Sequence, residues 1–261
     1  MGPKRTMLAC VTSLALLAGG AASAVAQEDE TSTGEMLEIF FVGDRLIADN
    51  DRLDSHFHKL LSADDMVSEF LTGSCVIADA TLRQHYEQSL ADDGDEDSGA
   101  IDMIREGDFD VVVLQGALFD PTEEAFAEYL EYAALFDEEI RARGGRTVLF
   151  MTWPPLTDGA QLDKMADFYR RAGVDPGATV APVGLALANA QAERPEIRVV
   201  GLDPRLPSLA GTYAGAAVVY ASIFERSPEG LAYWPSYLLG DDAAYLQEVA
   251  WRTVEEWRSE D

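Results

Sequence analysis

Cysteine is nearly absent from this sequence. Only Cys10 and Cys75 occur among the 261 residues, and Cys10 falls in an N-terminal stretch that has the features of a cleaved leader. Removal of that leader leaves Cys75 alone, which excludes a disulfide within the mature chain. Cys75 is followed by Val76 and Ile77, so we expect a buried, inert thiol rather than a reactive nucleophile. The stability of the fold must therefore come from packing.

Long apolar runs are also absent once the first residues are set aside. Near the N-terminus, Lys4 and Arg5 precede an apolar stretch of about a dozen residues that ends in Ala24-Val25-Ala26, the layout of a secretory signal too short to span a membrane. No later run is long enough to predict a membrane span. We therefore expect a secreted or periplasmic protein with a signal peptide over residues 1–26, a disordered segment over 27–35 and a single domain over 36–261.

Basic residues are scarce. Nineteen Lys and Arg residues stand against 47 Asp and Glu residues, for a formal net charge of −28, and loss of Lys4 and Arg5 with the leader would bring it to −30. Nucleic acids and anionic membranes need a basic footprint, so both are excluded as partners. A surface adapted to high salt, where ions screen the self-repulsion, is the simplest interpretation. Binding of cations or of a basic partner is the alternative.

Short apolar runs rich in β-branched and aromatic residues alternate with helical patterns. Continuous apolar runs indicate strands buried on both faces, and the alternation predicts a parallel sheet with helices on either side. The fold class we expect is a three-layer α/β/α sandwich with a five-stranded, flavodoxin-like parallel sheet. The expected strands cover residues 36–42, 74–78, 110–115, 147–151 and 197–202.

Ligands of open parallel sheets bind beyond the carboxyl ends of the strands, so the residues that follow each strand carry the chemistry. Three segments stand out in order: "VGDRL" (42–46), "DVVVLQ" (110–115) and "PSLAGTYAGAAVVYASIFERSPEGL" (207–231). Together they resemble the SGNH, or GDSL-like, hydrolase superfamily, over roughly residues 36–231. The resemblance implies the SGNH hydrolase fold.

In that superfamily, a serine at the first turn attacks an ester, a histidine accepts its proton, and an aspartate three residues before the histidine orients the ring. Here the serine position is Arg45, which is no nucleophile. The histidine position is Leu206, with Asp203 retained. The groups that would stabilise the oxyanion, a glycine after strand two and an amide after strand three, fall on Asp79 (or Ala78) and on Ala117.

Loss of several members of one catalytic unit removes the mechanism. The resemblance therefore implies a catalytically inactive member with a binding or accessory role, which needs no cofactor. The alternative is an active esterase or acetyl-esterase with a non-standard catalytic set.

Other residues offer little chemistry. His56 and His58 are spaced i, i+2 on an expected helix, which is a poor arrangement for a shared metal, and we expect His85 at the surface or at a helix cap. The acidic run over 91–99 resembles a calcium loop but has Ser98 where that loop has glycine. A metal site made by the acids after the strands stays an alternative, and we expect no metal.

Arg45 is long enough to cross the old triad, and its forked guanidinium matches a carboxylate. We therefore expect Arg45 to pair with Asp203 or with Asp79 and to fill the former active site. The alternatives are that it binds an anionic group of a ligand, or that it points into solvent. By analogy with the substrates of the superfamily, the ligand would be a saccharide or another small molecule. The residues expected to contact it are Asp44, Arg45, Asp79, Gln115 and Asp203.

Overall fold

The computed structural model describes residues 36–90, 99–118, 122–174 and 177–260. The expected signal peptide, the segment over 27–35 and most of the acidic run over 91–99 lie outside these residues. Within them, no helix is both long and apolar enough to cross a membrane.

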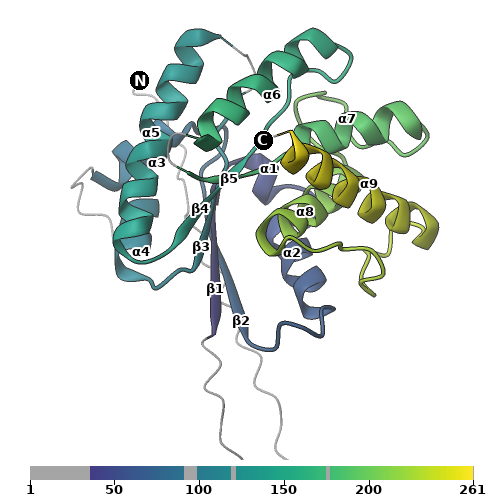
Figure 1. Ribbon diagram of the computed structural model, residues 1–261, viewed down its shortest axis with the longest axis horizontal. Helices are drawn as coiled ribbons and strands as arrows, with labels where there is room; N and C mark the ends of the chain where they lie inside the picture. The colour runs from purple at the N-terminus through teal and green to yellow at the C-terminus, as the bar shows by residue number, and fades with distance from the viewer. Residues whose placement is uncertain (1–35, 91–98, 119–121, 175–176, 261) are drawn as a thin grey trace, which may run out of the picture.

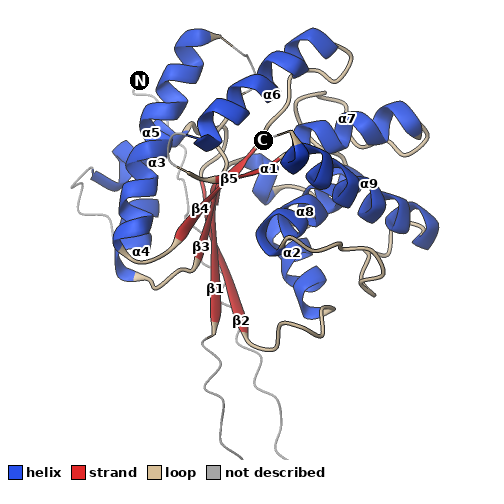
Figure 2. Ribbon diagram, in the orientation of Figure 1, coloured by secondary structure: helices blue, strands red, loops and turns tan. Residues whose placement is uncertain are grey.

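A parallel five-stranded sheet forms the middle layer of the molecule (Figure 2). The strand order is β2-β1-β3-β4-β5, and every neighbouring pair is parallel. The central strands are apolar on both faces, because helices cover both sides. The strands are β1 (Leu37–Gly43), β2 (Phe70–Val76), β3 (Val111–Leu114), β4 (Arg146–Phe150) and β5 (Thr179–Ala181).

Helices form the two outer layers (Figure 1). One layer holds α3 (Leu82–Leu90), α4 (Ala100–Glu106) and α5 (Glu123–Ala142), which pack on one another. The other holds α2 (Leu53–Ser62), α7 (Val183–Glu193), α8 (Leu209–Phe224) and α9 (Gly240–Ser259). The one-turn helix α1 (Arg45–Ala48) follows β1, and α6 (Gly159–Val174) packs on α7 and β5. The expected α/β/α sandwich with a five-stranded parallel sheet is confirmed.

The fifth strand was predicted in the wrong place. The sheet is completed by Thr179–Ala181, whereas 197–202 contains only an isolated bridge between Val200 and Pro207. Val199 is nevertheless fully buried, because the segment packs against the start of α8. Burial of a loop produces the same apolar run as a strand, while the true edge strand is too short to stand out. Asp203 therefore lies in a loop that leads into α8, and not at a strand end.

Helix α8 is the central helix of its layer. Its residues from Gly211 to Ile223 are buried, as its nearly uniform apolar sequence predicts. Glycine is required near its start, since a Cβ on Gly211 would lie 1.9 Å from the carbonyl oxygen of Val199. The Ser208 hydroxyl caps the helix by accepting a hydrogen bond from the Gly211 N–H at 3.1 Å. The start of α8 is thus fixed against the loop that carries Asp203.

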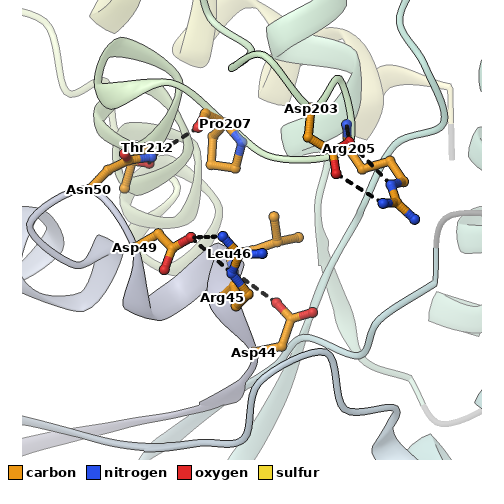
Figure 3. Close-up of polar contacts among 9 residues, drawn as sticks. All are labelled: Asp44, Arg45, Leu46, Asp49, Asn50, Asp203, Arg205, Pro207 and Thr212. Carbon is orange, nitrogen blue, oxygen red and sulfur yellow. Dashed lines mark hydrogen bonds and ion pairs between the residues drawn. The ribbon is translucent and has the colours of Figure 1, made fainter.

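Three consecutive non-glycine residues between α1 and α2 have left-handed backbones: Asn50, Asp51 and Arg52, with φ of 57°, 61° and 67°. Such conformations are costly, and they persist where side chains hold them. The Asn50 side-chain amide donates to the carbonyl of Pro207 and to the hydroxyl of Thr212, each at 2.9 Å (Figure 3). Asn50 therefore ties the end of α1 to the loop before α8.

This tie can be measured with a matched pair of variants. Glycine relieves the backbone strain equally at both positions, but Asn50→Gly also removes two hydrogen bonds, whereas the Asp51 side chain is exposed. We expect Asn50→Gly to be less stable than Asp51→Gly by about 1–3 kcal/mol in urea unfolding. Equal free energies of unfolding for the two variants would show that the Asn50 bridge contributes nothing.

Candidate functional site

The buried side-chain amide of Gln115 holds the turn after β1 in place. Gln115, at the end of β3, is fully buried, and its Oε1 accepts a hydrogen bond from the backbone N–H of Asp44 at 2.7 Å. The Asp44 carboxylate is also buried and caps α1 by accepting from the Leu46 N–H at 2.8 Å. Gly43 is required here, because a Cβ on it would lie 2.7 Å from Gln115 Oε1. The Gln115 side chain therefore joins the end of β3 to the backbone that follows β1.

Burial raises the pKa of Asp44 to about 6. The hydrogen bond from Leu46 opposes this shift, and the nearby Asp79 carboxylate adds to it. Three of the residues expected to contact a ligand thus lie close together at the carboxyl ends of the strands: Asp44, Asp79 and Gln115. Their role in binding a ligand stays a prediction.

His85 lies beneath the same turn. It is fully buried, and one ring nitrogen, Nε2, is 2.9 Å from the carbonyl oxygen of Gly43. A carbonyl only accepts, so Nε2 carries the proton, and Nδ1 has no hydrogen-bond partner. Burial lowers the pKa of His85 to about 4, which keeps the ring neutral. The expectation of a surface or helix-capping role was wrong, because Leu82 and His85 share the buried face of α3.

Arg45 pairs with neither of the carboxylates expected of it. Its Nε and one terminal nitrogen donate to the same carboxylate oxygen of Asp49, at 3.1 and 2.9 Å (Figure 3). The two residues are spaced i, i+4, which places them on one face of a single helical turn. Their side chains are 42% and 37% exposed, so the pair contributes little to stability. No Arg45–Asp203 or Arg45–Asp79 ion pair forms; Arg45 pairs with Asp49 instead.

Asp203 has its own partner. Its two carboxylate oxygens accept from the Arg205 side chain at 3.1 and 2.9 Å, and one of them also accepts from the Arg205 backbone N–H at 3.0 Å. These bonds lower the pKa of Asp203, with a smaller contribution from the Arg45 charge. Asp203 therefore has no need of a long-range partner, which explains why the expected pair with Arg45 does not form.

The other positions at which catalytic groups of the superfamily were expected lie around these groups. Leu206 is half-buried and packs against the core. Asp79 is exposed and has a left-handed backbone, with φ of 56°. The backbone N–H of Ala117 donates to the carbonyl of Ala80 at 2.9 Å, which joins the loops after β2 and β3. Neither Leu206 nor Ala117 offers a side-chain donor or acceptor to a reacting group.

The other two histidines serve separate parts of the structure. His56 is buried, with Nδ1 at 2.7 Å from the Tyr233 hydroxyl and Nε2 at 3.1 Å from the Asn50 carbonyl oxygen. His58 Nδ1 is 3.0 Å from the Thr72 hydroxyl in β2. Burial lowers the pKa of both rings. His56 and His58 have no hydrogen-bond partner in common. The described residues contain no group of three or more His, Cys, Asp or Glu side chains suited to a metal.

The sequence did not predict the hydrogen bonds that two residues of this region, Asn50 and His85, make to neighbouring segments. The run "ADND" (48–51) did carry a signal, since Asn and Asp are the non-glycine residues that most readily adopt left-handed backbones. The contact between His85 and Gly43 joins residues 42 positions apart, and nothing local in the sequence indicates it. Cys75 is buried, as predicted.

The raised pKa of Asp44 gives a test of this geometry. The folded state holds the proton more tightly than the unfolded state, so the free energy of unfolding falls as the pH rises from about 4 to about 6. Asp44→Asn keeps the cap acceptor and removes this penalty. From pH 3.5 to pH 7 we expect the variant to gain about 3 kcal/mol on the unmutated protein in urea unfolding.

Asp203→Asn is the control for this titration. The pKa of Asp203 is lowered, so its carboxylate stabilises the fold above its ordinary pKa and that contribution is lost on acidification. Relative to the unmutated protein, Asp203→Asn should therefore lose stability as the pH rises, opposite to Asp44→Asn. A pH-independent difference for Asp44→Asn would contradict the buried, proton-holding carboxyl.

Comparison with known proteins finds solved structures that have a similar fold. The sequence matches no protein-family model and no curated protein. Among solved structures, a DUF4886 family protein from Bacteroides uniformis ATCC 8492 aligns with a TM-score of 0.70 and 16% identity, over 85% of this chain and 95% of that one.

Two further solved structures have a similar fold. A proposed SGNH hydrolase from Slackia heliotrinireducens has a TM-score of 0.57 at 22% identity, over 72% of this chain and 99% of that one. Axe2, an acetylxylan esterase from Geobacillus stearothermophilus, has a TM-score of 0.53 at 14% identity, over 72% of this chain and 93% of that one. The chain therefore has an SGNH hydrolase-like α/β fold.

Proposed function

We propose that this chain is an exported, non-catalytic protein with the SGNH hydrolase-like fold, which binds a saccharide or another small ligand at the carboxyl ends of its strands. The observation that carries the proposal is the state of the turn after β1. Arg45 stands where the serine is expected, and its guanidinium is held by Asp49. A guanidinium stays protonated at any ordinary pH and cannot attack an ester.

The lack of a base at the same place supports the proposal. Leu206 occupies the expected histidine position, and Asp203, which would orient that histidine, is bonded to Arg205. Each of the three histidines is held by a structural partner: Gly43 for His85, Tyr233 and Asn50 for His56, and Thr72 for His58. His85 lies beneath the turn after β1, but its ring is fully buried. A serine hydrolase mechanism needs its nucleophile and base within hydrogen-bond reach of each other.

Analogy and charge support a neutral ligand. Axe2, which has the same kind of fold, is an acetylxylan esterase by its description, so a saccharide is the first ligand to consider. The formal charge of −28 opposes anions. The carboxylates of Asp49, Asp79 and Asp203 would accept hydrogen bonds from sugar hydroxyls, and Arg45 would donate to them. These contacts would bind the ligand without reacting with it.

Hydrolysis of p-nitrophenyl acetate tests the absence of catalysis. We expect the unmutated protein and the single variants Arg45→Ser and Leu206→His to stay at the rate of buffer alone, since one restored group does not rebuild a unit that acts together. Any gain in rate should appear only in the Arg45→Ser/Leu206→His double variant, as measured by release of p-nitrophenolate.

Turnover by the unmutated protein would reject the proposal and favour an esterase with a non-standard catalytic set. A contaminating esterase is excluded if the activity survives a second, orthogonal purification step and a mock preparation from cells without the gene is inactive.

A further inference from the structure

The segment that joins α8 to α9, residues 225–239, carries exposed apolar side chains. Trp234 is 48% exposed, Tyr237 39% and Leu239 73%. The Tyr237 hydroxyl donates to the carbonyl oxygen of Leu209 at 3.2 Å, which places its ring beside the start of α8, and Leu209 is itself 39% exposed. A Cβ on Gly240 would lie 3.5 Å from the Trp234 ring, so this ring reaches the residue after Leu239. We call the side chains of Leu209, Trp234, Tyr237 and Leu239 the aromatic patch.

The backbone beneath the aromatic patch is held in place, so the exposure does not come from poor packing. Pro235 and Leu238 are buried, and the Leu238 N–H donates to the Pro235 carbonyl at 3.0 Å. The Gln247 side chain in α9 donates to the Leu231 carbonyl and accepts from the Gly230 N–H, each at 3.1 Å. The apolar side chains therefore face water on a preformed surface, which is typical of a binding surface for another macromolecule.

The composition of this segment is that of a protein–protein interface. Residues 230–240 contain no charged residue, although charged residues make up 25% of the chain. Trp and Tyr contribute strongly to the affinity of interfaces, because each buries a large ring and loses little conformational freedom. The Tyr237 hydroxyl is already bonded to Leu209, so its ring is presented in a fixed orientation. The aromatic patch therefore suits an apolar surface on a partner protein.

Charge decides which partner fits the aromatic patch. The formal net charge of −28 repels a second copy of the chain and an anionic lipid surface alike. Burial raises the pKa of Tyr237, and the nearby Asp51 carboxylate raises it further. Asp51 is exposed, as is Asp241, which follows the patch in the first turn of α9. Lys59, whose ammonium lies over the Tyr233 ring, offsets only part of this negative charge. Basic groups on a partner would therefore find acids at the border of the patch.

We propose that the aromatic patch is a docking surface for a partner protein, which contributes a segment with apolar side chains on one face and Lys or Arg beside them. The apolar face covers Trp234 and Leu239, and the basic side chains pair with Asp51 and Asp241. None of the residues proposed to contact a small ligand belongs to the aromatic patch, so docking does not depend on that proposed function.

Three synthetic helical peptides test this surface by isothermal titration calorimetry. The first has leucine on one face and lysine on the other, the second has glutamate in place of lysine, and the third has alanine in place of leucine. We expect the Leu/Lys peptide to bind about tenfold more tightly than either of the others, because it alone supplies both apolar contact and positive charge. Trp234→Ala/Leu239→Ala should weaken its binding about tenfold. The Leu/Lys peptide should also reduce quenching of tryptophan fluorescence by acrylamide, and Trp234→Phe should abolish that reduction.

Met66→Ala/Leu90→Ala is the matched control, because it removes two exposed apolar side chains that lie outside the aromatic patch. It should bind the Leu/Lys peptide as tightly as the unmutated protein. If Trp234→Ala/Leu239→Ala binds like this control, or if the three peptides bind equally or not at all, the docking surface is rejected. Binding to phosphatidylcholine vesicles, or self-association in sedimentation at high salt, would overturn the basic protein partner if Trp234→Ala/Leu239→Ala abolished it.

Discussion

The arrangement of the candidate site depends on the hydrogen bond between the Gln115 side chain and the backbone N–H of Asp44. This buried bond joins the ends of two neighbouring strands and fixes where α1 begins. Since Asp44 then caps α1, the single turn of that helix places Arg45 beside Asp49 and delivers Asn50 to the loop before α8. Each contact follows from the one before it, so the position of the turn determines the positions of both sides of the site.

Two charged side chains of this region, Arg45 and Asp203, are paired with residues nearby in the sequence. Arg45 is paired four residues along the chain, and Asp203 two residues along the chain. Neither pair crosses from one loop to the other, and the crossing contact is made instead by a neutral amide, that of Asn50. A neutral bridge costs less to bury than an ion pair, because no charge has to leave water. Arg45 and Asp203 consequently stay partly exposed to solvent.

Sequence patterns predicted the layers and the positions of β1, β3 and β4, because a strand buried on both faces has a continuous apolar run. The second strand was expected over 74–78, but β2 is half-buried and begins at Phe70. The patterns failed for the fifth strand, because a buried segment is not always a strand. Residues 197–202 form a buried loop, and β5 is too short to have a recognisable pattern. They also failed for Arg45 and His85. A sequence shows which groups can pair, but the choice between Asp49 and Asp203 depends on distances that only the folded backbone defines. The burial of His85 under Gly43 likewise depends on how α3 docks on the sheet.

The close approach of Gly211 to the Val199 carbonyl has a consequence for the kinetics of recognition. A helix that is buried on all sides and in backbone contact with its neighbour has no room to slide or tilt. The start of α8 would therefore meet a ligand of the proposed kind in the shape it already has. Binding to such a preformed surface involves little ordering, so related ligands should associate at similar rates and differ chiefly in how long they stay bound.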